Sequence, residues 1–453
     1  MSTSVATRPM PVDRFIVALD DVRAADASRV GPKAANLAAL ARAGLPTPGG
    51  FCLTADAYLA QVAALGLDDA VCRFAAADPR EQRRLSVEIR LALYEQPIRP
   101  DIVEPLRGTW HAQRAASSKP CAVRSSALIE DRKGANFAGQ FESFLGIDDE
   151  AAFLTAVRAC WAALWTTNAR RYMDNHGLSP AATAMAVLIQ PLVDARASGG
   201  GLSENAEGQM LLSATWGLGS AIAQGEVVPD RIVLTRQGFL RTNEAGRKRH
   251  ADICRHGASG DANGSRAGVA PQAVPGELVD KPCLSAGDAV ALGRLLRKAE
   301  AVLGMPVEIE WALDEGGFKL LQARPLPPPC PPGEGRVGVP DEIWLKHPGL
   351  NGHPAGIGWG AGRAAVVNCE CELSRIAPGD ILVTRVAGPA LSHVLPRVAG
   401  VVAELGGSTS HLASLARERG IPMVLGVRDA TRKIPDGAQV AVDGVAGIVR
   451  WMA

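Results

Sequence analysis

One histidine near the C-terminus follows a run of glycine and hydroxyl residues. Residues 406–411 read GGSTSH, and the apolar-periodic segment LASLARE follows them. This pattern predicts a tight turn after a strand, a Ser/Thr cap and a helix that begins at His411. The backbone N–H groups and the positive end of such a helix would receive an anion. His411 could therefore act as a nucleophile toward phosphorus, and the alternative is a histidine near a helix start with no chemistry.

Four polar residues alternate along a predicted β-hairpin further upstream. Glu308 and Glu310 lie two residues apart in one strand, a DEGG turn follows, and Gln322 and Arg324 lie two residues apart in the next strand. Side chains two residues apart point to the same face of a strand. Two carboxylates and an amide oxygen suit Mg²⁺, and an arginine fork suits phosphate oxygens. We therefore expect a metal site made by Glu308, Glu310 and Gln322, with Arg324 beside it; the alternative is an exposed strand face.

The elements that must position these groups follow from periodicity and from turn residues. In the first part of the chain we predict helices over 31–44 and 284–303, a buried strand over 184–192, and hairpin strands over 307–311 and 318–322. In the last part we predict strands over 381–384, 400–404, 423–426 and 439–442, and a helix over 411–419. Residues 241–275 are polar and rich in glycine, and we expect an exposed connection there. Strands interleaved with helices indicate an α/β (α+β) fold class.

A proline-rich stretch divides the chain. Residues 325–340 read PLPPPCPPGEGRVGVP, which excludes a helix or a central strand because proline lacks the N–H group. Such a segment acts as a semi-rigid spacer. We therefore expect a first domain of residues 1–325, a linker of residues 326–345 and a second domain of residues 346–453.

The composition disfavours several classes of protein. Among 453 residues, 48 Lys and Arg nearly balance 47 Asp and Glu, and aromatic residues make up 4%. Nucleic-acid binders that neutralise phosphates normally show a basic excess and use aromatic residues for stacking, so we expect no nucleic-acid partner. No stretch approaches the roughly 20 apolar residues of a membrane span, and the N-terminus lacks a signal-peptide pattern. We expect a cytoplasmic protein with no membrane contact.

The cysteines do not form a recognisable framework. There are nine, an odd number scattered over a long chain, which is typical of a reduced protein rather than a disulfide scaffold. Cys369 and Cys371 form a Cys-x-Cys pair with no second pair at zinc-finger spacing. We expect alternate positions on a strand there rather than a structural zinc site.

The segment GGSTSHLASLARERGIPMV, residues 406–424, resembles the swivelling phosphohistidine domain of the phosphoenolpyruvate-utilising enzymes. This family includes pyruvate phosphate dikinase, phosphoenolpyruvate synthase and rifampin phosphotransferase. The segment PGDILVT at 378–384 agrees with it. Further segments resemble the family's ATP-binding half: GPKAANL at 31–37, VRSSA at 123–127, FAGQFESFL at 137–145, ATWGLG at 214–219, GEVVPD at 225–230, VEIEW at 307–311 and LQARP at 321–325.

The resemblance implies an ATP-grasp-type nucleotide-binding domain with an extra N-terminal lobe, followed by a compact swivelling phosphohistidine domain. It implies ATP and Mg²⁺ as cofactors. Lys33 and Arg124 would hold phosphates, Gly139 would let the backbone approach them, and Ser143 stands where the family usually has threonine. Gln190 would mark the segment that contacts the adenine. The residues expected to contact ATP are Lys33, Arg124, Gly139, Ser143, Gln190, Glu310, Gln322 and Arg324.

The chain also departs from the family pattern. Residues 198–202 read SGGGL where the family usually has SGV-x-FT, so a strand that lines the phosphates is expected to differ. No segment resembles the barrel that binds pyruvate or phosphoenolpyruvate. An acceptor would therefore bind between the two domains or on a separate subunit.

The resemblance implies an ATP-dependent dikinase-type phosphotransferase. ATP would phosphorylate His411 with release of AMP and phosphate, and the domain would swivel to pass the phosphoryl group to a small-molecule acceptor or to a separate acceptor subunit. The alternative is a donor subunit or a self-phosphorylating carrier or regulatory module that acts through a partner protein.

Overall fold

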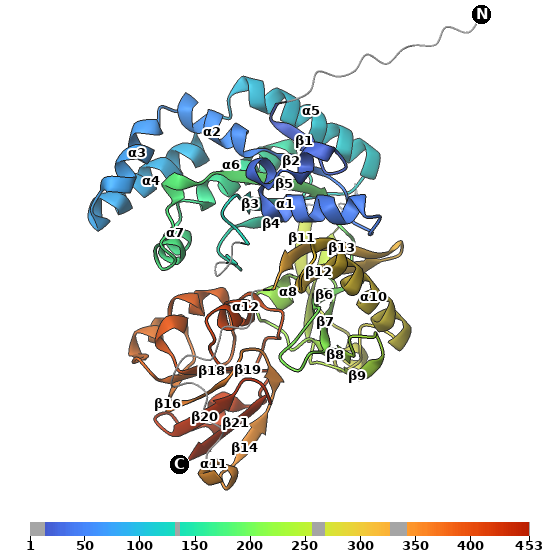
Figure 1. The fold of residues 1–453 in the computed structure, drawn as a ribbon, viewed down its shortest axis with the longest axis vertical. Coiled ribbons are helices and arrows are strands. Elements are labelled where there is room, and N and C mark those ends of the chain that lie inside the picture. The colour runs from blue at the N-terminus through green and yellow to red at the C-terminus, as the bar shows by residue number, and fades with distance from the viewer. Residues whose placement is uncertain (1–13, 132–135, 256–267, 327–341, 453) are drawn as a thin grey trace, which may run out of the picture.

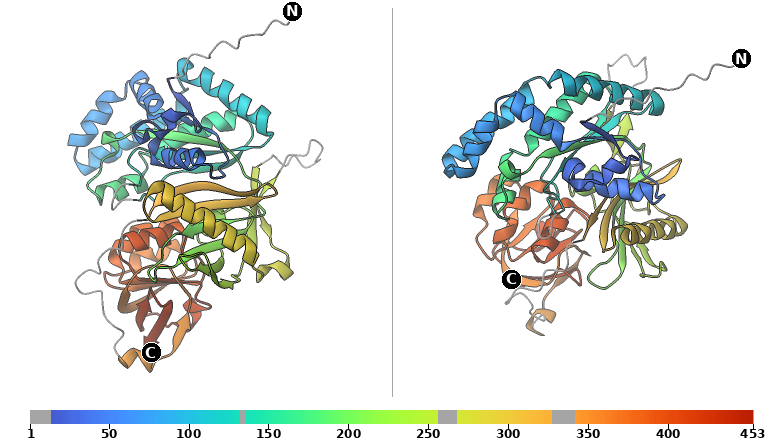
Figure 2. Two further views of the ribbon diagram at one scale, coloured as in Figure 1. Left: turned by 45° about the vertical axis from the view of Figure 1, so that its right-hand side comes forward. Right: turned by 45° about the horizontal axis from the view of Figure 1, so that its top comes forward.

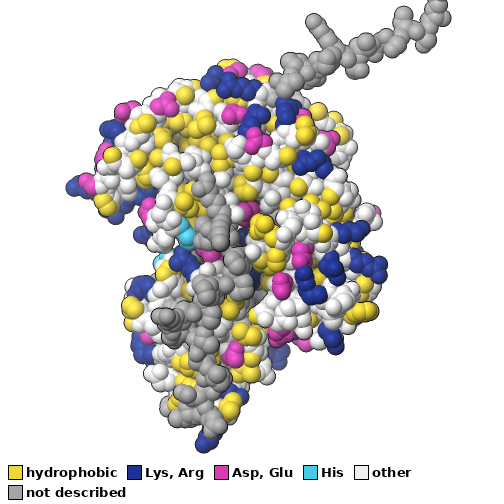
Figure 3. Space-filling view, viewed as in Figure 1, with side chains coloured by type: hydrophobic (Ala, Val, Ile, Leu, Met, Phe, Trp, Pro, Cys, Tyr) yellow, Lys and Arg dark blue, Asp and Glu magenta, His cyan; other side chains and the backbone are white. Residues whose placement is uncertain are grey.

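The computed structural model describes residues 14–131, 136–255, 268–326 and 342–452. They form three lobes, which we call the N-terminal lobe (14–193), the middle lobe (194–326) and the C-terminal lobe (342–452). The N-terminal and C-terminal lobes lie at the top and bottom of Figure 1, and the middle lobe lies against both. Acidic and basic side chains lie interspersed over the face shown in Figure 3, as the balanced charge predicts.

A five-stranded antiparallel sheet forms the centre of the N-terminal lobe. Its strands, in spatial order, are β1 (Ile16–Ala18), β2 (Phe51–Leu53), β5 (Met185–Pro191), β3 (Cys121–Ala127) and β4 (Ser143–Ile147). Its helices are α1 (Ala27–Arg42), α2 (Ala55–Ala64), α3 (Asp68–Ala76), α4 (Pro79–Glu95), α5 (Pro100–Ser117), α6 (Glu150–Ala163) and α7 (Thr167–Asp174), with the 3-10 turns η1 (Val22–Ala25) and η2 (Pro180–Ala182). Strand β5 is buried on both faces, as its apolar run predicts. Leu188 packs with α1, whereas Val187 and Ile189 belong to the core that contains α2, α4 and α6.

A six-stranded antiparallel sheet forms the middle lobe. Its strands, in spatial order, are β13 (Gly317–Pro325), β12 (Val307–Asp314), β6 (Ala197–Leu202), β7 (Met210–Trp216), β8 (Asp230–Leu234) and β9 (Leu240–Glu244). Its helices are α8 (Ser220–Ala223), α9 (Gly276–Val279) and α10 (Ala286–Leu303). Helix α10, olive in Figure 2, lies across this sheet and buries Leu292 and Leu296 against it. Ser285 starts α10 through a capping box with Asp288, and Gly304 ends it in the left-handed conformation.

The expected connection at 241–275 is wrong in part. Strand β9 ends at Glu244, and β10 (His250–Arg255) pairs with β11 (Gly268–Ala273) in a separate two-stranded antiparallel sheet. Strand β10 also contacts the segment that follows β7, because Leu218 and Asp252 form an isolated bridge. Polar composition concealed these strands, since pairing and packing against distant residues determine strand formation more than intrinsic propensity does.

An eight-stranded mixed sheet forms the C-terminal lobe. Its strands, in spatial order, are β14 (Gly349–Asn351), β21 (Ile448–Met452), β20 (Gln439–Asp443), β16 (Trp359–Val367), β17 (Ile381–Thr384), β18 (Gly400–Ala403), β19 (Met423–Leu425) and β15 (His353–Pro354). Its helices are α11 (Glu342–Leu345), α12 (His411–Glu418) and α13 (Ala430–Lys433), with the 3-10 turns η3 (Glu370–Arg375), η4 (Pro389–His393) and η5 (Leu395–Arg397). Strands β16 to β19 are parallel. Helix α12 connects β18 to β19, and the predicted strands and helix of this part are confirmed. The α/β fold class is confirmed in all three lobes.

Most of the predicted linker, residues 327–341, lies outside the described residues, and residues 342–345 form α11. The domain boundaries therefore stay predictions. Within the described ranges, no helix combines the length and apolarity that a bilayer span requires.

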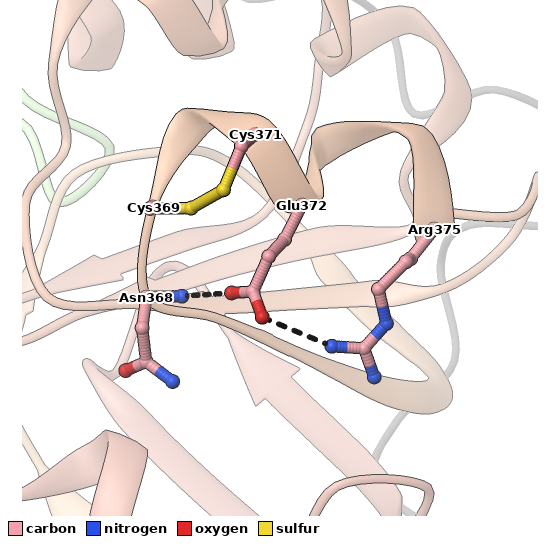
Figure 4. Close-up of a disulfide and its surroundings, with 5 residues drawn as sticks. All are labelled: Asn368, Cys369, Cys371, Glu372 and Arg375. Atoms are coloured by element: carbon pink, nitrogen blue, oxygen red, sulfur yellow. Dashed lines mark hydrogen bonds and ion pairs between the residues drawn. A yellow bond between two sulfur atoms is a disulfide. The ribbon is translucent and has the colours of Figure 1, made fainter.

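The expectation for Cys369 and Cys371 is wrong. The two residues form a disulfide at the start of η3, not alternate positions on a strand (Figure 4). Their Cα atoms are 5.4 Å apart, which lies within the range of disulfides. On a strand, residues two positions apart are separated by about 6.6 Å, toward the far end of that range. The helical turn therefore brings the two sulfur atoms together.

Candidate active site

A cavity of about 540 Å³ lies where the three lobes meet. All residues that the sequence analysis assigned to the site line this cavity: Lys33, Arg124, Gly139, Ser143, Gln190, Glu308, Glu310, Gln322, Arg324 and His411. His411 comes from the C-terminal lobe, and the other nine come from the N-terminal and middle lobes. The structure thus brings residues nearly 380 positions apart in sequence around one space, while their individual roles stay predictions.

Lys33 lies at the start of the second part of α1. The helix is interrupted at Gly31, whose φ of +76° favours glycine, and a Cβ there would lie 2.4 Å from the carbonyl oxygen of Ser126. Gly31 therefore lets α1 approach β3 closely. The Lys33 ammonium donates to the carbonyl oxygen of Ser125 at 2.6 Å and forms an ion pair with Glu130 at 3.2 Å. These contacts hold a buried positive charge at the cavity wall.

Arg124 on β3 contacts the predicted hairpin directly. One of its nitrogens, Nη2, donates to Glu310 Oε2 at 2.6 Å and to Gln322 Oε1 at 3.0 Å. Glu310 and Gln322 face each other across β12 and β13. Burial alone would raise the pKa of Glu310, but Arg124, His411 and Arg324 lower it to about 2. The Glu310 carboxylate is therefore ionised at any working pH.

Glu308 and Arg324 form a second buried pair that reaches the C-terminal lobe. Arg324 Nη2 donates to Glu308 Oε2 at 2.8 Å and to the Ser414 hydroxyl at 3.0 Å. Arg417 Nη2 lies 3.4 Å from the other Glu308 oxygen. Ser414 and Arg417 both belong to α12, the helix that begins at His411. One carboxylate thus connects the middle lobe to the histidine helix.

The donor set for a metal is made of oxygens. Among the described residues, no group of three or more His, Cys, Asp and Glu side chains is arranged around a common point. The oxygens of Glu310 and Gln322, however, converge on a single nitrogen of Arg124. A carboxylate and an amide oxygen that meet at one point fit Mg²⁺, which takes most of its remaining ligands from water or phosphate. Glu308 is turned toward Arg324 and Arg417 instead.

His411 is the first residue of α12, and the Ser410 hydroxyl caps that helix by accepting from Ala413 N. Burial lowers the pKa of His411 to about 4; Glu310 opposes this shift, and Arg324 adds to it. The imidazole is therefore neutral near pH 7, which leaves one ring nitrogen free to attack an electrophile. Gly139 lies directly beside it, because a Cβ at Gly139 would be 3.1 Å from His411 Cβ. Gly139 has a φ of +66°, so both its conformation and this close approach favour glycine.

The three glycines of β6 explain the departure at residues 198–202. A Cβ at Gly199 would lie 1.9 Å from the carbonyl oxygen of Ser213, and one at Gly200 would lie 2.6 Å from Thr409 Cβ. Gly200 therefore makes room for the segment that precedes His411. The local sequence marked this strand as unusual but did not indicate that it seats another lobe.

Two further predicted residues, Gln190 and Ser143, also line the cavity. Gln190, near the end of β5, is buried and donates through Nε2 to the carbonyl oxygen of Gly49 at 3.4 Å. Ser143 begins β4 and is exposed. Ser414, Arg417 and Glu418 are not among the predicted site residues, although the segment LASLARE that carries them belongs to the motif around His411.

Residues 27–327 match the family model of the pyruvate phosphate dikinase AMP/ATP-binding domain. The chain belongs to the pyruvate phosphate dikinase family. Residues 376–447 match the model of the mobile domain of the PEP-utilising enzymes. The resemblance stated from the sequence is thereby confirmed, and so is the ATP-grasp-type fold of the first part.

Curated relatives cover nearly the whole chain. A probable phosphoenolpyruvate synthase from Pyrococcus abyssi is 29% identical over 96% of this chain and 58% of its own length. A similar protein from Methanothermobacter thermautotrophicus is 31% identical over 96% of this chain and 63% of its own length. The phosphoenolpyruvate synthase of Escherichia coli is 30% identical over 93% of this chain and 55% of its own length. The chain therefore spans between 55% and 63% of the length of these relatives.

Proposed function

We propose that this chain is an ATP-dependent phosphotransferase of the dikinase type. ATP binds in the cavity between the N-terminal and middle lobes, and His411 accepts a phosphoryl group from it. One ATP and one water give AMP, inorganic phosphate and phosphorylated His411. The C-terminal lobe then moves and delivers the phosphoryl group to an acceptor.

The observation that carries this proposal is the position of His411. A neutral imidazole from one lobe lies in a cavity whose other walls carry Lys33, Arg124 and Arg324. Three cations suit a triphosphate, and arginine suits it best because its fork binds two oxygens at once. A nucleophile held beside a bound electrophile gains much of its rate from proximity alone.

Mg²⁺ belongs to the proposal as a cofactor. Glu310 and Gln322 would hold it, with Glu308 as a further candidate, and it would supply charge neutralisation for the phosphate oxygens. Arg124, which donates to both oxygens in this structure, would then be free to turn toward a phosphate. Gly139 and Ser143 would lie along the phosphates, and Gln190 at the nucleoside end.

The proposal divides the chain into an ATP-binding domain (1–325), a linker (326–345) and a swivelling domain (346–453). A histidine that receives phosphate at one place and delivers it at another must travel between them. The acceptor is either a small molecule or a separate subunit. Because the relatives are named phosphoenolpyruvate synthases, pyruvate is the first acceptor to test.

The experiment uses ATP labelled at the β- or the γ-phosphate. We expect AMP as the nucleotide product, γ-label in inorganic phosphate and β-label on the protein, with the protein label absent in His411→Ala. ADP as the sole nucleotide product would contradict the dikinase assignment. Labelling that stops after one equivalent, with every acceptor tried, would favour the alternative of a carrier module that acts through a partner protein.

A further inference from the structure

Glu418, the last residue of α12, is buried against the N-terminal lobe. Its side chain is 3% exposed, and its carboxylate accepts three hydrogen bonds from that lobe. The donors are Asn136 N at 3.0 Å, the Tyr172 hydroxyl at 2.7 Å and His176 Nε2 at 3.1 Å. None of these four residues lines the main cavity except Asn136. Glu418, Tyr172 and His176 therefore lie outside the cavity wall, and Asn136 joins the cluster to it.

Nothing within the C-terminal lobe explains a carboxylate at this position. The C-terminal end of a helix carries partial negative charge, so an acidic residue there destabilises the helix. Burial of an unpaired carboxylate would cost still more. Both effects are offset only when the N-terminal lobe supplies its donors. Glu418 is thus favourable in the docked arrangement and unfavourable in any arrangement that buries it elsewhere.

The hydrogen bonds of His176 show that its ring is charged when the lobes are docked. Its Nδ1 lies 2.7 Å from the carbonyl oxygen of Tyr172, and its Nε2 lies 3.1 Å from Glu418. A carbonyl and a carboxylate can only accept, so both ring nitrogens must donate, which requires the imidazolium form. The hydrogen bond to Glu418 raises the pKa of His176, against the opposing effect of burial.

The same cluster fixes the loop that touches His411. Tyr172 accepts from Phe137 N at 3.3 Å, and the two rings lie 4.6 Å apart between centroids. Two residues further along the loop, Gly139 lies against His411. Helix α12 rises by about 1.5 Å per residue, so Glu418 and His411 attach it at points about 10 Å apart. Ser414 and Arg417 attach the middle of α12 to the middle lobe, and Glu418 adds an attachment of its last residue to the N-terminal lobe. Together these contacts fix the direction of the helix.

We propose that Glu418 is a positioning residue that docks the C-terminal lobe in the arrangement in which His411 receives phosphate, through Asn136, Tyr172 and His176 of the N-terminal lobe. This inference rests on the proposed function. Glu418 contacts neither nucleotide nor phosphate. It acts on the population and the orientation of the docked lobe, and releasing it is part of the movement that delivers the phosphoryl group.

The test compares Glu418→Gln with Glu372→Gln, a matched change on the same lobe. The Glu372 carboxylate accepts from Asn368 and Arg375, which belong to its own lobe (Figure 4). With saturating labelled ATP, we expect Glu418→Gln to label His411 at least tenfold more slowly than wild type, with the Kd for ATP unchanged within about threefold. Glu372→Gln should label like wild type.

A second phosphoryl donor separates docking from reactivity. Phosphoramidate is small enough to phosphorylate an accessible histidine without the ATP site, so Glu418→Gln should react with it at least as fast as wild type. Equal losses with ATP and with phosphoramidate would overturn the proposal, and so would wild-type labelling from ATP. If the wild-type chain takes no label from ATP at all, the proposed function itself fails.

The partner on the other lobe gives an independent variant. His176→Gln should slow labelling from ATP as well, and the double variant should be no slower than Glu418→Gln, because both changes remove the same interaction.

The docked imidazolium of His176 faces Glu418 and Arg419 of the C-terminal lobe and Tyr172 of its own lobe. Because docking raises the pKa of His176, the contribution of this imidazolium to docking is complete below about pH 6.5. That contribution is lost as the pH rises through the pKa of the docked state. The rate of wild-type labelling should therefore decline as the pH rises through the docked pKa of His176, and this decline should be absent in Glu418→Gln. Additive losses in the double variant of Glu418 and His176, or the same decline in Glu418→Gln, would contradict the proposal.

Discussion

Gly200→Ala tests how closely the histidine segment must seat on β6. In the structure a Cβ at this position would lie 2.6 Å from Thr409 Cβ and 2.8 Å from its hydroxyl oxygen. Carbon atoms in contact are about 3.5–4.0 Å apart, so the two segments must separate by about 1 Å. Overpacking of this kind costs about 1–3 kcal/mol, and a misplacement of about 1 Å can slow a reaction by about 100-fold. We expect phosphorylation of His411 to slow by about 10- to 100-fold.

The assay is single-turnover labelling of His411 at saturating ATP, with ATP affinity measured separately. The matched control is Gly388→Ala, because Gly388 of the C-terminal lobe also faces the middle lobe but a Cβ there would meet its nearest neighbour, the carbonyl oxygen of Gln224, at an ordinary 3.9 Å. Gly388→Ala should label like wild type. Adding Thr409→Gly to Gly200→Ala removes the colliding Cβ and should restore part of the rate. Normal labelling by Gly200→Ala, or equal losses in both single variants, would refute the reasoning.

Three further predictions concern the groups around the cavity. His411→Ala should abolish labelling and leave the Kd for ATP within about threefold; a tenfold change, about 1.4 kcal/mol, would contradict the division of labour between lobes. Glu310→Gln should slow labelling of His411 by about 100-fold or more at normal Mg²⁺, because it removes a carboxylate that is a candidate Mg²⁺ ligand and leaves Arg124 without its ion-pair partner. Full labelling of this variant at reduced Mg²⁺ would exclude Glu310 as a ligand. Because burial lowers the pKa of docked His411 to about 4, its neutral form persists as the pH falls from 6.5 to 5. The rate of labelling should therefore stay within about twofold over that interval. A tenfold fall, as for an unperturbed imidazole, would argue that His411 is exposed to solvent.

The sequence predicts the local parts of this site well. The alternation of Glu308 with Glu310, and of Gln322 with Arg324, predicts which side chains share a face of the hairpin. The turn alone would place Glu310 opposite Leu321, and a register shift between Glu310 and Trp311 pairs it with Gln322 instead. The Ser/Thr cap before His411 likewise predicts where α12 begins.

Contacts between lobes are not predictable in the same way. Glu418 bonds residues about 240 to 280 positions away, and no local pattern specifies such a pair. The pairing of Arg417 with Glu308 and of Arg124 with Glu310 was missed for the same reason: alternation shows which side chains share a face but not what lies opposite that face. The strands β10 and β11 and the disulfide of Cys369 and Cys371 depend on pairing and on a local turn that composition does not reveal.

Arg324 contacts Glu308 in its own lobe and Ser414 in the C-terminal lobe, and it is also a candidate to hold phosphate. A single guanidinium that serves both purposes makes nucleotide binding and lobe docking thermodynamically coupled. If bound ATP changes the equilibrium constant for docking by some factor, then docking changes the affinity for ATP by the same factor. If phosphate draws Arg324 away from Ser414, ATP loosens the lobe that must react with it; if phosphate leaves that bond in place, ATP tightens it. The sign of this coupling would follow from the Kd for ATP of the whole chain compared with that of a form locked in the undocked arrangement. That sign determines whether the C-terminal lobe is mainly docked or undocked once ATP is bound.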